Sequence, residues 1–208
     1  MKRRIIVCAA ACLWVQTSNA SILFQPGPGN NNPVINSAGD QGVGQPISVT
    51  SAAVVTQFGF YLDMFFGGDI KFLIFDSTNT QLLYSSAPEA IGASNSLALV
   101  MSPVISFDAD AGETYHFGFA ADNIFGFGYY FPEEAYSQNG FSYAGGNDVY
   151  ALYAMPTFER SGNTNVGLEI DGTLTPASVP EPAMLLPLAL VFAAGLYRSR
   201  RRLMFRKH

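Results

Sequence analysis

The chain has 208 residues and a formal net charge of −5, from 11 Lys and Arg against 16 Asp and Glu. Nine of the basic residues lie in the first four or the last eleven positions, so residues 21–178 hold two basic side chains against fifteen acidic ones, a net charge of −13. Such a surface disfavours binding to nucleic acid or anionic lipid, which need basic side chains, and suits solubility, a divalent cation or a neutral sugar.

The first twenty residues have the three parts of a secretory signal peptide. The basic start Met1–Arg4 precedes the apolar run Ile5–Val15, and small side chains follow before Ser21. This order predicts that signal peptidase cuts between Ala20 and Ser21. The alternative is a lipoprotein cut before Cys12, but the three alanines ahead of that cysteine lack the usual leucine.

Both cysteines of the chain, Cys8 and Cys12, lie in this signal segment. Once residues 1–20 are removed, the exported chain has no disulfide, no thiolate metal ligand and no cysteine nucleophile. Its stability must come from an ordinary hydrophobic core, for which the roughly 155 residues before the C-terminal tail are enough.

Residues 21–45 are rich in Pro, Gly and Asn. Within them Ser21–Phe24 is short and apolar, and Gln25–Pro33 is expected to be a loop or linker. Residues 46–175 contain short apolar or alternating runs, separated by turn residues, which predict strands. The expected strands are Ile47–Thr50, Val54–Phe66, Ile70–Phe75, Gln81–Ser85, Leu97–Met101, Val104–Phe107, Thr114–Ala121, Ile124–Phe131, Val149–Met155 and Val166–Ile170.

Val, Ile, Phe and Tyr dominate these runs, and no segment outside the two chain ends keeps a sustained 3.6-residue apolar period. About ten strands in this length predict an all-β domain. We expect an antiparallel two-sheet sandwich of the jelly-roll type, whose strand order the sequence leaves open.

Aromatic side chains alternate along two of the expected strands, so that each set shares one face. The sets are Tyr115, Phe117 and Phe119, and then Phe125, Phe127, Tyr129 and Phe131. Their expected role is to fill the core between the sheets. His116 lies on the other face of its strand and is therefore expected to point outward, as a surface residue.

Tyrosines in loops are better ligand candidates than phenylalanines in strands. Tyr130, Tyr136 and Tyr143 lie in an acidic, Asn-containing stretch. Because aromatic faces suit the C–H groups of carbohydrates, these three are the candidate sugar-binding residues. Simple exposure at the surface is the alternative.

The stretch from Asp108 to Glu113 begins like a calcium-binding loop, with carboxylates at alternate positions before a glycine. Asp108, Asp110 and Glu113 are therefore the candidate Ca²⁺ ligands, although the further ligands of an EF-hand are missing. A turn between two strands explains Gly112 equally well. No other cofactor is indicated.

Catalytic motifs are missing from the sequence. It has no Gly-x-Ser-x-Gly, no His-Glu-x-x-His and no glycine-rich phosphate loop. A pair of carboxylates for glycan hydrolysis remains an alternative, but nothing in the sequence favours one pair over another. We therefore expect no enzyme and nominate no catalytic residue.

Residues 176–208 have the parts of a membrane anchor, following a short extended spacer at Thr173–Ser178. The motif Val179, Pro180, Glu181 and Pro182 precedes the uncharged run 183–197, and a basic end at 198–208 begins with Arg198, Arg200, Arg201 and Arg202. Fifteen helical residues rise about 22 Å, somewhat less than the hydrocarbon core. The arginines keep their end in the cytoplasm and place the motif outside. An ordinary anchor that is never cut fits the same hydropathy.

This order of motif, apolar run and arginines resembles the PEP-CTERM sorting tail of Gram-negative bacteria. The resemblance implies that an exosortase reads and removes the tail, so that the protein is anchored transiently in the inner membrane and then reaches the cell surface or extracellular matrix. It also implies a setting of exopolysaccharide and biofilm.

A second resemblance concerns the body. The stretches 58–62, 70–76 and 111–115 resemble non-catalytic jelly-roll domains of secreted bacterial proteins. We therefore expect a non-enzymatic surface or matrix protein associated with exopolysaccharide. The alternatives are a secreted, carboxylate-dependent glycan hydrolase and a calcium-dependent carbohydrate-binding module.

Overall fold

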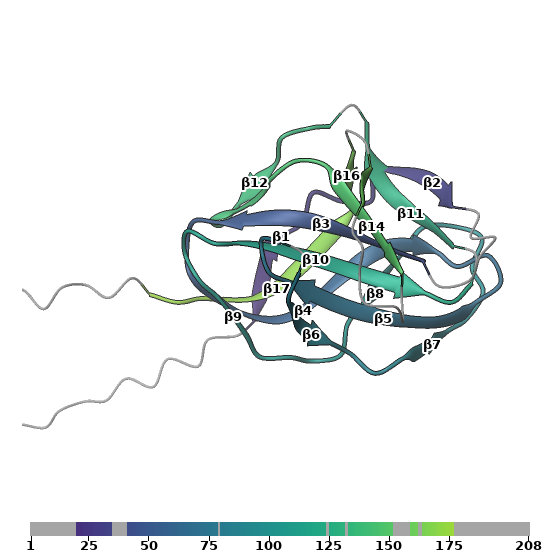
Figure 1. The fold of residues 1–208 in the computed structure, drawn as a ribbon, viewed down its shortest axis with the longest axis horizontal. Coiled ribbons are helices and arrows are strands. Elements are labelled where there is room, and N and C mark those ends of the chain that lie inside the picture. Colours follow the sequence, from purple (N-terminus) through teal and green to yellow (C-terminus); the bar gives the residue numbers. More distant parts are fainter. Residues whose placement is uncertain are drawn as a thin grey trace, which may run out of the picture. The chain divides into compact units, whose positions relative to one another are not determined.

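The structure is a computed structural model that describes residues 20–34, 41–78, 80–123, 125–131, 133–151, 159–161 and 164–176. Two compact units divide the chain, Met1–Leu174 and Thr175–His208. All the regular structure in the described residues is β-strand (Figure 1). The signal segment up to residue 19 and the tail from residue 177 lie outside the described residues.

The strands form two sheets, and every described pair is antiparallel. The first sheet contains β1 (Ser21–Phe24), β2 (Asn30–Val34), β4 (Ala53–Asp63), β8 (Ala98–Met101), β9 (Phe107–Ala109), β11 (Phe125–Tyr130), β16 (Asn165–Val166) and β17 (Leu168–Leu174). The second contains β3 (Gln41–Val49), β5 (Gly68–Phe75), β6 (Leu82–Ser85), β7 (Glu89–Ile91), β10 (Thr114–Ala121), β12 (Ser137–Gln138), β13 (Phe141–Tyr143), β14 (Asn147–Ala151) and β15 (Glu159–Ser161). The predicted all-β fold with two antiparallel sheets is confirmed.

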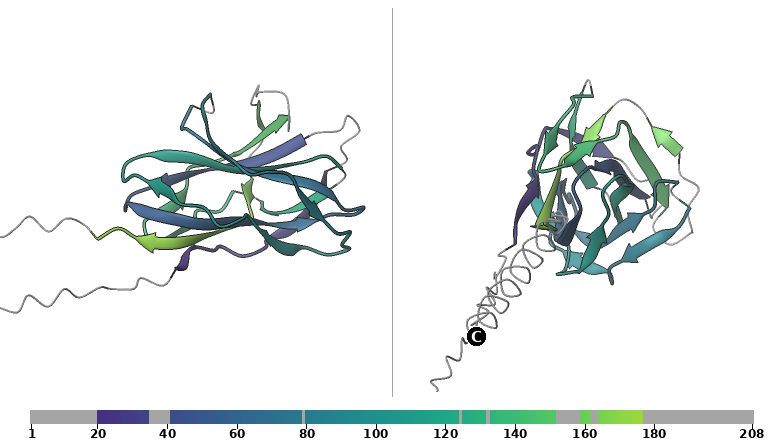
Figure 2. Two further views of the ribbon diagram at one scale, coloured as in Figure 1. Left: turned by 90° about the horizontal axis from the view of Figure 1, so that it is seen from below. Right: turned by 90° about the vertical axis from the view of Figure 1, so that its left-hand side faces the viewer.

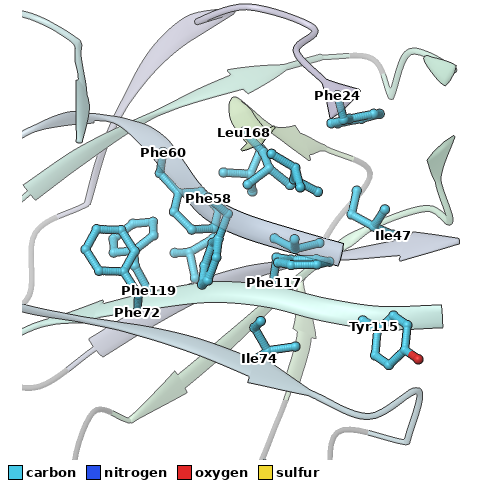
Figure 3. Close-up of a cluster of buried hydrophobic side chains, with 14 of the residues drawn as sticks. Phe24, Ile47, Phe58, Phe60, Phe72, Ile74, Tyr115, Phe117, Phe119 and Leu168 are labelled. Atoms are coloured by element: carbon cyan, nitrogen blue, oxygen red, sulfur yellow. The ribbon is translucent and has the colours of Figure 1, made fainter. Parts of the chain in front are cut away.

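Aromatic rings from the two sheets meet in the core (Figure 3). Phe58 of β4 packs edge-to-face on Phe117 of β10 and Phe72 of β5, with ring centroids 5.2 and 5.7 Å apart. Phe60 and Phe119 make a further contact across the sheets at 4.9 Å. All five rings are fully buried. Such pairs add specific geometry to the large apolar area that each ring buries.

The sandwich begins earlier in the chain than the sequence predicts. β1 pairs with β17 and β2 pairs with β11, so residues 21–34 contribute to the first sheet although the domain was expected from residue 46. The expected linker at Gln25–Pro33 therefore ends at Gly29. The Asn- and Pro-rich residues of β2 lack apolar alternation, so pairing to β11 rather than strand propensity explains this strand.

Other strand bounds also differ from expectation, and β7, β12, β13 and β15 were not expected. β4 ends at Asp63, so Phe66, which was expected in this strand, lies in the turn to β5. β3 starts six residues before Ile47, because the residues before Ile47 pair with the second part of β10, from His116 to Ala121. Only Phe107 of the expected strand at Val104–Phe107 is in β9, and Val104 is exposed. Thr173 and Leu174, expected in a spacer, complete β17 by pairing with Val54 and Ala53.

His116 departs from the prediction of an exposed side chain. It lies on the face of β10 away from the inter-sheet core, but only 4% of it is exposed. Its Nε2 is 3.3 Å from the carbonyl oxygen of Ser77, in the turn after β5. Leu73, Phe75 and Ala120 form a second buried cluster. The alternation therefore predicted correctly which face of β10 carries His116. It did not predict that other residues cover this face.

The first and last strands of the sandwich are neighbours. Ser21 pairs with Gly172, so β1 starts where β17 ends (Figures 1 and 2). We call this the terminal end. β4 starts there, with Ala53 paired to Leu174, and runs eleven residues to Asp63 at the opposite end, which we call the far end.

A candidate site around the N-terminal strand

The candidate ligand tyrosines come together around β1 and the segment that follows it. Phe24 is fully buried and packs edge-to-face on Tyr136 and Tyr143, with ring centroids 5.2 and 5.1 Å away. A shift in strand register between Ile22 and Phe24 allows the consecutive residues Leu23 and Phe24 both to be buried. The N-terminal strand thus places an aromatic ring between two of the candidate tyrosines. Tyr130 is the last residue of β11 and Tyr143 the last of β13, so only Tyr136 lies in a loop as expected.

The tyrosine hydroxyls donate hydrogen bonds to backbone carbonyls. Tyr130 bonds to the carbonyl oxygen of Pro26 at 2.6 Å and Tyr136 to that of Gln25 at 3.1 Å. Tyr143 donates to the carbonyl oxygen of Val166 in β16 at 2.7 Å. All three side chains are half-buried. Their hydroxyls therefore fasten the segment after β1, and β16, to the body.

The hairpin β12–β13 also holds β1 through hydrogen bonds made by the side chains of its turn and its first strand. The side-chain oxygen of Gln138 accepts a hydrogen bond from the backbone N–H of Gln25 at 2.9 Å. The amide of Asn139 donates to the carbonyl oxygens of Ile22 and Leu23 at 3.2 and 3.3 Å. Asn139 and Gly140 have φ of 49° and 83°, as expected for a tight hairpin turn. We call Tyr130, Tyr136, Tyr143, Gln138 and Asn139 the N-terminal clamp.

Glycines make room for the segment between β1 and β2. The carbonyl oxygen of Pro28 lies 1.9 Å from where a Cβ on Gly128 would be, and 2.8 Å from one on Gly167. Gly27 and Gly29 have φ of 102° and 64°, which L side chains rarely adopt. The chain can therefore pass close over β11 and the β16–β17 junction only because these positions lack side chains.

Burial governs the chemistry of the clamp hydroxyls. It raises the pKa of Tyr143, and the neighbouring Tyr130 and Tyr136 add to this. Burial also raises the pKa of Tyr130. Both hydroxyls therefore stay protonated and keep donating at physiological pH.

Two carboxylates of β17 lie beside the clamp, and the sequence analysis did not single them out. Glu169 is 6% exposed, and its Oε2 accepts a hydrogen bond from the side-chain amide of Gln25. Burial raises its pKa, and the charge of Asp171 raises it further, whereas the bond from Gln25 opposes the shift. Burial raises the pKa of Asp171 as well. Among the described residues, nothing donates a hydrogen bond to the buried Oδ1 of Asp171.

The alternation Leu168-Glu169-Ile170-Asp171 indicates a strand with carboxylates on its solvent side. The pattern does not show that Gln25 covers Glu169. A buried amide–carboxyl contact between residues 144 positions apart has no signal in a single sequence.

A polar link inside the sandwich was also missed. Gln45 of β3 and Asn165 of β16 are fully buried. The side-chain oxygen of Gln45 accepts from the N–H of Val166 at 2.8 Å, and its amide donates to the carbonyl oxygen of Gly146 at 2.6 Å. These bonds join the second sheet to β16, the strand whose Val166 carbonyl accepts the hydrogen bond from Tyr143.

The candidate calcium ligands are placed apart from this site. Asp108 is in β9, whereas Asp110 and Glu113 are in the turn to β10, and all three are exposed. Gly112 has φ of 94° and its N–H donates to the carbonyl oxygen of Val49 at 2.7 Å, which accounts for this glycine by the turn. Within the described residues, no three His, Cys, Asp or Glu side chains are grouped so as to hold a metal ion.

The predicted processing positions lie at the edges of the described chain. Ala20 is exposed and Ser21 is the first residue of β1, with its hydroxyl donating to the carbonyl oxygen of Gly172 at 3.4 Å. The Val179–Pro182 motif and the basic end lie outside the described residues. The search for helices of membrane-spanning length and hydropathy covered the described residues and found none.

Comparison with known proteins adds no assignment to this site. No family model matches the chain, and the search of curated proteins found no match.

The tyrosines of the clamp already bind residues of the protein's own chain. The hydroxyls are bonded to backbone carbonyls, and the rings of Tyr136 and Tyr143 are packed against Phe24. A sugar-stacking platform needs an open ring face. The arrangement therefore favours a structural role for these tyrosines, fixing the first strand of the exported chain.

Proposed function

We propose that the protein is an exported, non-enzymatic surface or matrix protein associated with exopolysaccharide. Signal peptidase removes residues 1–20. The C-terminal tail then anchors the chain transiently in the inner membrane until an exosortase removes it, leaving a body of jelly-roll type at the cell surface or in the extracellular matrix.

The observation that carries this proposal is the order of three parts in the tail. Val179–Pro182 precedes an uncharged apolar run of fifteen residues, and the first of six basic residues follows at Arg198. A proline-stiffened, extended motif directly outside a membrane segment is suited to reading by a membrane protease, and the arginines orient it.

The extent of the fold supports the same assignment. The strands run from Ser21 to Leu174. The sandwich thus starts at the residue predicted to follow signal cleavage, and four residues lie between its last strand and the sorting motif. A body that fills the interval between two removable segments can stay folded when both are cut away.

The test is the intact mass of the protein recovered from its native cell envelope. We expect a chain that starts at Ser21 and lacks the arginines. Pro182→Ala should leave the tail uncut, because it removes one of the two prolines that stiffen the motif. Pro187→Ala is the matched control, since it replaces a proline of the apolar run outside the motif, and should be processed normally.

Recovery of a chain ending at His208 from cells with an active exosortase would contradict the sorting proposal. Release of reducing sugar from exopolysaccharide by the purified body would instead favour the hydrolase.

A further inference from the structure

Phe66 is the most exposed aromatic side chain of the described residues, with 70% of its surface open. It lies in the turn between β4 and β5, at the far end of the sandwich. Apolar side chains are commonly exposed singly, so exposure alone decides nothing. What distinguishes Phe66 is the backbone that presents it.

The turn is braced on one side by the loop after β7. The N–H and side-chain oxygen of Ser94 bond to the carbonyl oxygen and N–H of Met64, at 2.8 and 2.9 Å. Met64 itself is 1% exposed, and its carbonyl also accepts from the N–H of Gly67 at 3.1 Å. The backbone two residues before Phe66 is therefore fixed in the core.

The turn between β10 and β11 braces the other side. Asp122 accepts a hydrogen bond from the N–H of Asp69 through its Oδ1 at 2.8 Å, and its own N–H donates to the carbonyl oxygen of Asp69 at 3.1 Å. Gly67 and Gly68 have φ of 71° and 149°, and a Cβ on either would lie under 3.0 Å from neighbouring atoms. Hydrogen bonds on both sides thus preorganise the turn that carries the exposed ring.

The far end is also the end of the sandwich away from its first and last strand residues, Ser21 and Leu174. The eleven residues of β4 span roughly 33 Å at about 3.3 Å per residue. Phe66 therefore lies about that far from the strand ends at Ser21 and Leu174. A body tethered through its terminal end presents this ring away from the tether.

We propose that Phe66 is a contact residue for a neutral polysaccharide, its ring stacking on the C–H face of a sugar unit. The proposal rests on the proposed function, which places the body among exopolysaccharide, and it moves the binding role from the clamp tyrosines to the far end. The negative face of an aromatic ring attracts the polarised C–H groups of a sugar.

Size and charge favour this occupant over others. One ring offers far less than the roughly 800 Å² per partner of a stable protein interface, whereas a repeating polymer offers the same weak contact to many copies. The carboxylates of Asp69, in β5, and Asp122, in the turn after β10, lie beside the turn that carries Phe66, within a body of net charge −13. They disfavour an anionic polymer or an anionic membrane.

The experiment measures migration of the full chain, purified in detergent, through native gels that contain hydroxyethylcellulose or galactomannan, both neutral, or alginate, a polyuronate. We expect the neutral polymers to retard the wild type and alginate not to. Phe66→Ala should weaken the apparent affinity by about five- to tenfold. Phe66→Leu, which keeps an apolar side chain without the ring, should lose about as much, and Phe66→Trp should bind.

Phe131→Ala is the matched control, because Phe131 is a second exposed ring, at 64%, after the end of β11. It should bind as the wild type does. The proposal is overturned if neither neutral polymer retards the wild type, if Phe66→Ala and Phe131→Ala lose affinity equally, or if Phe66→Leu binds as tightly as the wild type. Light scattering that shows Phe66-dependent self-association would make a second copy the occupant instead.

The two proposals fail separately. Phe66→Ala should be exported and cut normally, because the change leaves the signal segment, the sorting motif and the residues next to them unaltered. An uncut tail in the wild type contradicts the sorting proposal, whereas the gel result concerns only the ring.

Discussion

Gly128 shows how a single missing side chain shapes the first sheet. A Cβ at this position would lie 1.9 Å from the carbonyl oxygen of Pro28 and 3.0 Å from its carbonyl carbon. These are backbone atoms, so no side chain can rotate away to relieve the contact. The segment that the clamp holds would have to move.

We therefore expect Gly128→Ala to destabilise the fold by about 3 kcal/mol, at the upper end of ordinary overpacking. In a body of this size that lowers the melting temperature by about 6 to 12 °C. Gly92→Ala is the control, because a Cβ there has no neighbour within 4 Å and Gly92 has no positive φ. The melting temperatures are measured by circular dichroism. Equal values for the two variants would show that the segment around Pro28 can shift with little loss of stability.

Glu169 makes a second prediction at this scale, through pH. Its pKa is raised in the fold, chiefly by burial and then by the charge of Asp171. A raised carboxyl pKa means that the folded state binds the proton more tightly than the unfolded chain does. The stability from this group is therefore fully present below the ordinary value of 4.5 and is lost as pH rises through the folded pKa.

Glu169→Gln keeps a neutral group of the same shape at all pH values. Its unfolding free energy, measured by urea denaturation between about pH 4 and 8, should fall less with rising pH than that of the wild type. Glu113→Gln, at an exposed carboxyl in the turn before β10, controls for the general effect of removing a negative charge. A pH dependence unchanged in Glu169→Gln would mean that Glu169 ionises as freely in the fold as in the unfolded chain.

At the scale of elements, β1 depends on contacts from both sheets. It pairs with β17 in the first sheet, while the hairpin β12–β13 of the second sheet bonds to its backbone through side chains. Tyr143 completes this arrangement by joining β13 to β16 and packing on Phe24. Such an edge strand has few backbone partners of its own, so side chains decide how firmly it is held.

Tyr143→Phe keeps the ring and removes the hydroxyl that bonds to Val166. We expect a loss of about 1 kcal/mol and faster amide hydrogen exchange in β13 and β16, with little change in β10. Tyr129→Phe is the matched control, because the hydroxyl of Tyr129 makes no hydrogen bond among the described residues. If both variants exchange as the wild type does, the hydroxyl of Tyr143 is not needed to hold these strands.

How far the sequence predicts these elements depends on where each element finds its partners. β10 was predicted with both bounds because Tyr115, Phe117 and Phe119 are buried at every second position, which is a local signal. β2 was missed because its Asn-rich residues are strand only through pairing with β11. Local pattern reports burial on one face, whereas long-range pairing leaves no local trace.

The candidate site divides in the same way. The sequence identified Tyr130, Tyr136 and Tyr143 as a related group, and the structure places them together, but around the protein's own Gln25 and Pro26. The carbonyl partners of Tyr130 and Tyr136 lie more than 100 positions earlier in the chain, whereas that of Tyr143 lies 23 positions later. The burial of His116 and Glu169 likewise depends on segments that pass over the outer faces of the sheets, which alternation cannot report.

At the scale of the whole molecule, the feature with the widest consequence is that the first and last strands of the sandwich are neighbours. Paired residues of antiparallel strands have Cα atoms about 5 Å apart, so the residue pair Ser21 and Gly172 brings the two ends of the sandwich together. This arrangement lets one body be flanked by the two segments whose removal we propose, without a strand crossing the fold to reach either.

The closeness of the ends predicts that the sandwich tolerates circular permutation. Joining Thr175 to Ser21 through a short Gly-Ser linker needs no displacement of β1 or β17. New ends can be opened between Asn95 and Ser96, which are exposed and outside any strand. Because native pairing and core contacts are all kept, we expect a strand-rich far-UV spectrum and cooperative thermal unfolding.

The matched control uses the same linker but opens the chain between Phe117 and Gly118, in the middle of β10. That strand pairs with β3 and β5 on its two sides and contributes the fully buried Phe117 and Phe119. Dividing it should abolish cooperative unfolding, because each half keeps too few contacts to fix the other. The permutant opened at Asn95 could also fail to fold. That result would mean that a short linker cannot join Leu174 to Ser21 without pulling β1 from β17. The two ends of the sandwich would then not lie as close together as the register indicates. If only the permutant opened at Asn95 folds, its stability shows that Ser21 and Leu174 lie close together in the sandwich. This conclusion does not depend on whether the tail is processed.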